Sequence, residues 1–262
     1  MGKNKKKTRG EIHKKIMQKI NIGRQDPDQP IEWTPYQGEE VIMKMVIRKG
    51  QKIEEREFCP DRVNAVPKGN AYIIGNGPSR KNKLDLDTLK NTGQTYGCNA
   101  LYRDFIPDYL FMVDRFISQK IVDDKVFDKC ICYAPALEFN RSKRKLHLIP
   151  HNPHWISGSA AFWTACMHGH KNIYLVGFDF REYGKDQLNN IYQDTDNYGP
   201  RHSDTIFEPW LQQYRSICKR RPYCNFTVVH DNPPDYVQAI PFENHSVMSY
   251  ADFIGKVLNQ QT

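Results

Sequence analysis

AYIIGNGPS, residues 71 to 79, is the stretch of sequence that decides the fold of this chain. Its first four residues are apolar and predict a buried strand, and a glycine-rich loop follows directly. Gly75 and Gly77 permit positive φ and close approach of a ligand. Pro78 fixes the exit of the loop, and Ser79 can cap a following turn whose free N–H groups attract phosphate. The stretch therefore predicts a nucleotide-type ligand at this loop, although an ordinary tight turn between strand and helix stays open because the spacing matches neither the dinucleotide fingerprint nor the Walker loop.

Outward from this stretch, short apolar runs alternate with helical patterns. The runs predicted as strands are residues 71–75, 95–98, 109–113, 129–134, 172–176 and 226–229. The predicted helices are residues 85–91, 116–122, 157–168 and 205–219. This alternation indicates an α/β fold with a doubly wound, mostly parallel sheet. Ligands of such sheets bind beyond the carboxyl ends of the strands.

The net charge of +8 is concentrated at the N-terminus. Residues 1–24 form a predicted flexible basic tail that holds nine of the 38 Lys and Arg side chains but only Glu11 among the acids. The rest of the chain has equal numbers of basic and acidic side chains, which gives the folded body no general preference for polyanions. The tail is either a solvated arm or a contact for nucleic acid, an anionic membrane or a partner protein. Residues 25–68 are predicted to be an extension or linker, and residues 69–262 the nucleotide-binding transferase domain.

The seven cysteines form no CxxC pair, and their spacing relative to the nine histidines is not typical of metal ligands. They are expected to be reduced core residues, and no metal site is predicted. No stretch is apolar enough to span a membrane, and the polar N-terminus lacks the apolar core of a signal peptide. The expected location is the cytoplasm, in a bacterium or a virus-infected cell.

Polar residues follow several predicted strands at the same edge of the sheet. Asn99, Asp114 and Asp179 come directly after or close to the ends of three apolar runs, the last of them in Gly177-Phe178-Asp179. Ser157-Gly158 opens a predicted helix and offers a second helix N-terminus. Each residue by itself is compatible with a plain turn or helix cap. Together they predict a pocket for ribose and base beside the Gly75–Ser79 loop.

GNGPS, CNALYRDF with PDYLFMVD, and SGSAAFWTACMHGHKNIYLVGFDF occur in an order that resembles the bacterial sialyltransferases that use CMP-activated sialic acid. The resemblance covers about 130 residues, from Ala71 to His202. It implies a Rossmann-like domain and an inverting, metal-independent transfer of a sialic-acid-like (nonulosonic) sugar from a CMP-activated or other nucleotide-sugar donor. No cofactor is required, and the acceptor is a glycan, a protein or a modified nucleic acid. The positions that match the family's CMP site are Asn76, Ser79, Asn99, Asp114, Ser157, Gly158, Gly177 and Asp179, and Gly75, Gly77 and Pro78 complete the predicted nucleotide site.

The same resemblance assigns His202, in GPRHSDTIFEPWL, as the general base. A His suits this role because its pKa lies near neutrality, although a surface-loop His is the alternative. Residues 181–205 look like the family's mobile lid. Its tyrosines Tyr183, Tyr192 and Tyr198 are candidates for binding the leaving phosphate, and a solvated surface loop is again the alternative.

Two departures leave the donor sugar open. The family usually has Thr before its Ser-Gly and Arg two residues earlier, where this chain has Ile156 and His154. A related branch that shares GxGPS and PDYxxxxD includes flagellin-modifying transferases and enzymes that transfer pyrophosphate from ATP to a pterin alcohol. A magnesium-dependent pyrophosphokinase is therefore one alternative. A non-catalytic nucleotide-fold module that is docked by its basic tail is another.

Overall fold

The computed structural model describes residues 41–48, 51–58, 69–142, 145–149, 155–181, 183, 189–199 and 207–259. The chain divides into two compact units, Met1–Cys59 and Pro60–Thr262. In the first unit, β1 (Val41–Arg48) and β2 (Gln51–Phe58) pair as an antiparallel hairpin. The basic tail lies outside the described residues, so its role stays a prediction, as do the domain limits at residues 24 and 68.

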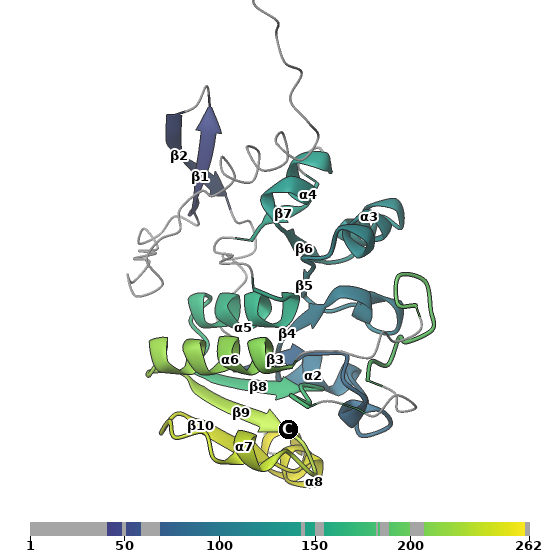
Figure 1. Ribbon diagram of the computed structural model, residues 1–262, viewed down its shortest axis with the longest axis vertical. Coiled ribbons are helices and arrows are strands. Elements are labelled where there is room, and N and C mark those ends of the chain that lie inside the picture. Colours follow the sequence, from purple (N-terminus) through teal and green to yellow (C-terminus); the bar gives the residue numbers. More distant parts are fainter. Residues whose placement is uncertain are drawn as a thin grey trace, which may run out of the picture. The chain divides into compact units, whose positions relative to one another are not determined.

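The second unit is built on an eight-stranded sheet in which every pairing is parallel. The strand order is β10-β9-β8-β3-β4-β5-β6-β7 (Figure 1). The strands are β3 (Asn70–Ile74), β4 (Gly93–Cys98), β5 (Tyr109–Phe111), β6 (Ile131–Ala134), β7 (His147–Leu148), β8 (Asn172–Val176), β9 (Asn225–Val229) and β10 (His245–Met248). This arrangement confirms the predicted doubly wound, Rossmann-like α/β fold.

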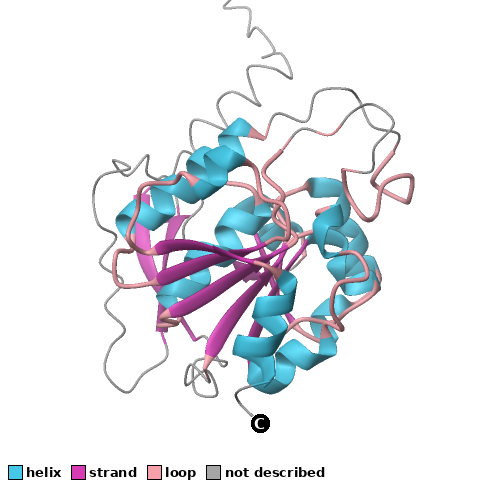
Figure 2. Cartoon of the chain, turned by 90° about the horizontal axis from the view of Figure 1, so that it is seen from below, coloured by secondary structure: helices cyan, strands magenta, loops and turns pink. Residues whose placement is uncertain are grey.

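Helices cover both faces of this sheet (Figure 2). They are α2 (Asp87–Thr92), α3 (Arg115–Asp123), α4 (Ala136–Arg141), α5 (Ser157–Met167), α6 (Glu208–Arg220), α7 (Asp235–Gln238) and α8 (Tyr250–Phe253). Short helical turns are η1 (Pro78–Arg80), η2 (Asn99–Arg103), η3 (Val126–Asp128) and η4 (Ile254–Leu258). Within the described residues, no helix is long and apolar enough to cross a membrane.

The core lies between the sheet and these two helical layers. On one face, Tyr72 and Ile74 of β3 pack with Leu89 of α2 and Phe253 of α8. On the other face, α5 contacts β3, β4, β5 and β8, and ten of its residues are buried, from Ser157 to Cys166. A helix that is apolar all round needs cover on every side, and α6 supplies it from beside α5 (Figure 1). The six cysteines in the described residues are free, and five of them are buried.

The direction of chain winding reverses between β3 and β8. From β3 the chain moves outward through β4 to β7, and it then returns to β8, which pairs with the other edge of β3. Two backbone hydrogen bonds continue this pairing beyond the strands, from Gly75 N–H to Val176 O at 2.8 Å and from Gly77 N–H to Gly177 O at 3.0 Å. A Cβ on Gly75 would lie 2.5 Å from the Gly177 oxygen, so no larger residue fits there. Ligands of doubly wound sheets bind at this switch point, which is where the sequence placed its site.

We expect Gly177→Ala to destabilise the protein for two reasons. Gly177 has a left-handed backbone, and the two loops also approach each other closely at this residue. Gly177 has φ 73° and a Cβ would lie 2.8 Å from Gly75 O, whereas Gly169 has φ 91° and no atom within 4 Å of its Cβ position. We expect Gly169→Ala to cost about 1 kcal/mol of unfolding free energy from the left-handed backbone. Gly177→Ala should cost roughly 1–3 kcal/mol more, because the loops must separate. Urea unfolding of both variants measures this, and equal losses would contradict the contact.

Buried histidines should make the fold sensitive to mild acid. Burial lowers the pKa of His170, His230 and His245 below the ordinary value of 6.5. The unfolded chain therefore binds more protons than the native state below about pH 6.5, and stability present above that pH is lost as the pH falls. We expect the free energy of unfolding to decrease between pH 7 and pH 5, with a shallower decrease in His170→Gln. A pH-independent free energy over that range would show that these rings are not buried in neutral form.

Candidate functional site

The Gly75–Ser79 loop is joined to the loop after β8 along its whole length. Beyond the two glycine contacts, the Ser79 N–H donates to the Asp179 carboxylate at 3.2 Å. A Cβ on Gly77 would lie 2.6 Å from that carboxylate. The backbone N–H groups of Gly75, Gly77 and Ser79 are therefore donated inside the protein. These three donors are not free for an anion at this loop.

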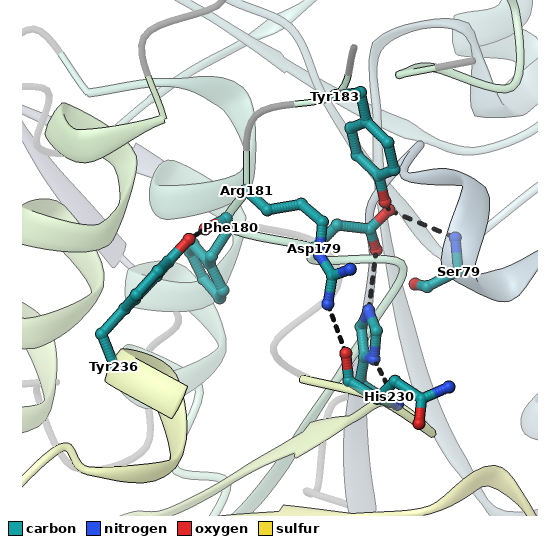
Figure 3. Close-up of polar contacts among 8 residues, drawn as sticks. Ser79, Asp179, Phe180, Arg181, Tyr183, His230 and Tyr236 are labelled. Carbon is teal, nitrogen blue, oxygen red and sulfur yellow. Dashed lines mark hydrogen bonds and ion pairs between the residues drawn. The ribbon is translucent and has the colours of Figure 1, made fainter. Parts of the chain in front are cut away.

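Asp179 is the centre of a buried polar cluster. Figure 3 shows Ser79, Tyr183 and His230 converging on its carboxylate. Tyr183 donates its hydroxyl to Asp179 Oδ2 at 2.5 Å, and His230 Nε2 lies 3.8 Å from Oδ1. His230 Nδ1 accepts the Asn232 N–H at 3.0 Å, so the proton of the neutral ring sits on Nε2 and faces Asp179. Burial raises the pKa of Tyr183, and its hydrogen bond to Asp179 raises it further.

Asn76, Asn99 and Ser157 meet on the neighbouring part of the sheet edge. Asn76 Nδ2 donates to Cys98 O at 3.1 Å, and Asn76 Oδ1 is buried with no hydrogen-bond partner among the described residues. The Ser157 hydroxyl donates to Asn99 Oδ1 at 2.7 Å and accepts the Val113 N–H at 3.0 Å. The structure thus brings together the ends of β3, β4 and β5 and the start of α5, as the sequence predicted.

Two residues at this edge have left-handed backbone. Asn99 has φ 51° and Phe180 has φ 48°. Asn adopts this conformation readily, whereas a buried Phe does so only at a cost. The Phe180 carbonyl accepts the Tyr236 hydroxyl at 2.6 Å, which fixes the turn after Asp179. Strained backbone that the surrounding structure holds in place is typical of functional sites.

Asp114 and Gly158 have structural roles, in line with the turn and helix-cap alternative that the sequence left open. The exposed Asp114 carboxylate caps α3 by accepting the Phe116 N–H at 2.9 Å. A Cβ on Gly158 would lie 2.7 Å from the ring of Phe178, so this glycine lets α5 approach the loop after β8. Pro78 opens η1. None of these tasks tests a contact with a nucleotide, which stays a prediction.

The described part of the predicted lid, residues 189–199, rests on the Gly75–Ser79 loop. The Ile191 N–H donates to Asn76 O at 2.9 Å, and Arg103 donates to Thr195 Oγ1 and to Asp196 O, both at 2.7 Å. Tyr192 is buried, and burial raises its pKa. Burial also raises the pKa of Tyr198, to about 12. Tyr192 and Tyr198 therefore lie on the Asn76 side of the site, while Tyr183 lies at Asp179.

His202 and the rest of the predicted lid, residues 182, 184–188 and 200–205, lie outside the described residues. Ile156, the departure before Ser157, donates its N–H to Gln213 Oε1 at 3.1 Å, which ties the start of α5 to α6. Among the described residues, no group of three His, Cys, Asp or Glu side chains is arranged to hold a metal ion.

Two site residues were missed by the sequence analysis. His230 directly follows the predicted strand 226–229, so the strand-end rule that selected Asp179 also applies to it. Arg80 follows Ser79 and is buried, with Nε donating to Gly75 O at 2.7 Å and Nη2 to the Tyr192 hydroxyl oxygen at 3.4 Å. A basic residue directly after a phosphate-type loop was the signal available for Arg80.

No protein-family model and no curated protein matches the sequence. Two solved structures are similar in chain arrangement, and both are glycosyltransferases. One is the MAf glycosyltransferase from Magnetospirillum magneticum AMB-1, at 15% identity and TM-score 0.46, with 71% of this chain and 34% of that chain covered. The chain thus spans about a third of that enzyme's length. The other is the sialyltransferase CstII from Campylobacter jejuni in complex with a substrate analogue, CMP-3FNeuAc, at 17% identity and TM-score 0.40, covering 62% of this chain and 80% of that one. At these values the likeness concerns topology, so substrate and mechanism are inferred below from the residues of the site.

Proposed function

We propose that this protein is a glycosyltransferase that moves a sialic-acid-like sugar from a CMP-activated or other nucleotide-sugar donor to an acceptor hydroxyl. The observation that carries the proposal is the meeting of Asn76, Asn99 and Ser157 at the switch point, with Asn76 Oδ1 buried and unsatisfied. A buried acceptor without a donor is uncommon in a folded protein. A ribose hydroxyl or a base amino group supplies the missing donor.

The residues 189–199 support the same proposal through water exclusion. They contact the Asn76 loop, and Tyr192, one of them, is buried. An activated sugar is readily hydrolysed, so a transferase benefits from a segment that opens for the donor and closes over it. The contact between Ile191 and Asn76 supports such a role for these residues.

The reaction needs one base and one leaving-group site. The base takes the proton from the acceptor hydroxyl, and the acceptor oxygen bonds to the anomeric carbon as the bond from that carbon to the donor phosphate oxygen breaks. The electron pair leaves with the nucleotide phosphate, and a single displacement inverts the anomeric centre. His202 is proposed as the base from the family resemblance. The basic tail is proposed to bring the enzyme to its acceptor, whether glycan, protein or modified nucleic acid.

Removal of the Asn76 amide tests the site. We expect the wild-type protein to bind CMP and to release CMP slowly from CMP-linked nonulosonic acids. Asn76→Ala should lower this activity by at least about tenfold, the usual effect of losing a buried hydrogen bond to a ligand. The matched control is Asn225→Ala, which removes an exposed amide at the amino end of β9. Calorimetric titration and CMP release measure both variants, and failure of the wild type to bind CMP or hydrolyse any donor would overturn the proposal.

Removal of the proposed base separates glycosyl transfer from the pyrophosphokinase alternative. We expect His202→Ala to lose transfer to an acceptor by about 100-fold or more while CMP binding is retained, because a positioned base contributes on the order of 10²–10⁴-fold. Chelation with EDTA should leave the wild-type rate unchanged. A strict magnesium requirement together with full activity of His202→Ala on ATP would instead identify the pyrophosphokinase.

A further inference from the structure

Arg80 carries a buried positive charge that the proposed mechanism leaves unused. Its side chain is 8% exposed. Its hydrogen bonds go to two neutral oxygens, Gly75 O and the Tyr192 hydroxyl, the second over a long 3.4 Å. Among the described residues, no carboxylate lies within 4.0 Å of the guanidinium. Buried cations are normally paired with an anion, and Arg80 has no such partner within the part of the chain that the structure describes.

The position of this charge is the switch point itself. The stem of Arg80 packs over the loop after β8, where a Cβ on Gly177 would lie 2.9 Å from Arg80 Cδ. The guanidinium lies between the Gly75 carbonyl and the hydroxyl of Tyr192 in the lid segment. It also lies near Cys98 at the end of β4, whose pKa burial raises to about 12 against the opposing effect of Arg80. The charge is thus at the carboxyl edge shared by β3, β4 and β8.

Most backbone donors of the loop are already engaged. The N–H groups of Gly75, Gly77 and Ser79 are donated to the loop after β8, so they are not available to an anion. We infer that Arg80 is the counter-charge for the phosphate of the donor, an inference that rests on the proposed function and names a residue beyond it. A guanidinium suits this task because its donors are held in a rigid, planar fork that matches phosphate oxygens.

Tyr192 is the neutral partner of Arg80 in the structure. Its hydroxyl oxygen accepts from the guanidinium and also interacts with the exposed Asp104 carboxylate. Through Tyr192, Arg80 is linked to a negative charge only indirectly. A phosphate that enters the site gives Arg80 a direct partner in place of this indirect one, and it does so next to the segment that closes over the donor.

One buried guanidinium also limits the class of donor. The phosphate linkage of a CMP-linked sugar carries one negative charge, whereas the diphosphate of a nucleoside diphosphate sugar carries two and the triphosphate of ATP about four; the carboxylate of a nonulosonic acid adds a charge outside the phosphate. Each additional buried negative charge would need its own cation, hydrogen-bond network or metal ion. The site is therefore expected to favour nucleoside monophosphate donors over diphosphate donors.

The test compares the phosphate with the nucleoside that carries it. For the wild-type protein we expect CMP to bind at least about tenfold more tightly than cytidine, and CDP no more tightly than CMP, at constant ionic strength. In Arg80→Gln the ratio of CMP to cytidine affinity should fall towards one, while cytidine affinity changes less than about twofold. Arg80→Lys keeps the charge without the fork and should retain part of the ratio. Arg221→Gln, which removes an arginine stacked on Trp163 at the end of α6, is the matched control and should retain all of it.

A second measurement avoids dependence on the folding of the variants. Inorganic phosphate should raise the thermal midpoint of the wild-type protein above that in chloride of equal ionic strength, and CMP should abolish the difference by occupying the same site. The inference is overturned if Arg80→Gln keeps the wild-type ratio, or if phosphate gives no stabilisation. The proposed function fails separately if CMP and phosphate bind through Arg80 but no CMP-linked sugar is turned over.

Discussion

The backbone contact between Gly75 and Gly177 is the constraint on which the rest of the site depends. Two amide-to-carbonyl hydrogen bonds extend the parallel pairing of β3 and β8 past the ends of the strands. The loops come so close that a Cβ on either glycine would meet the other's carbonyl oxygen. With these loops joined, Asp179 lies against Gly77. Backbone atoms therefore form the bottom of the crevice that is usual at a switch point. Side chains therefore carry the recognition.

Asp179 connects the joined loops after β3 and β8 to Tyr183 of the predicted lid. Its carboxylate is buried and accepts hydrogen bonds from the Ser79 N–H and the Tyr183 hydroxyl, while the facing His230 ring is kept neutral by burial. Burial of a carboxylate is costly unless such donors accompany it. Asp179 Oδ1 has no hydrogen-bond donor among the described residues, so it is the carboxylate oxygen left for a further donor. The carboxylate thus joins the Gly75–Ser79 loop to Tyr183.

Much of the sheet could be predicted because local patterns determine it. The six predicted strands all exist, and 172–176 agrees with β8 at both ends. The missed strands were those without an apolar run: β7 has two residues, and β10 (HSVM) is an edge strand with no buried residue. Apolar periodicity detects burial, so it does not detect an edge strand that the sheet holds by backbone hydrogen bonds.

The site could be located from sequence, but its chemistry could not be fully assigned. Polar residues after apolar strands identified Asn76, Asn99 and Asp179, since parallel strands end at one edge, and a predicted helix start identified Ser157. Which amides are donated internally depends on the pairing of segments 100 residues apart, from Ser79 to Asp179, and no local pattern encodes it. The same holds for Arg80, which in sequence looks like an exposed basic residue and is buried only because the loop after β8 lies beside it.

Charge is distributed differently in the basic tail and in the site at the sheet edge. The basic residues of the tail are many and local in sequence, a pattern that attracts polyanions without selecting among them. The site has amides, hydroxyls and one buried guanidinium, a set that discriminates by hydrogen-bond geometry and the cost of an unmatched charge. A donor with one phosphate and several hydroxyl groups satisfies this set. Under the proposed function, the sheet edge selects the donor, and the basic tail is the proposed contact for the acceptor.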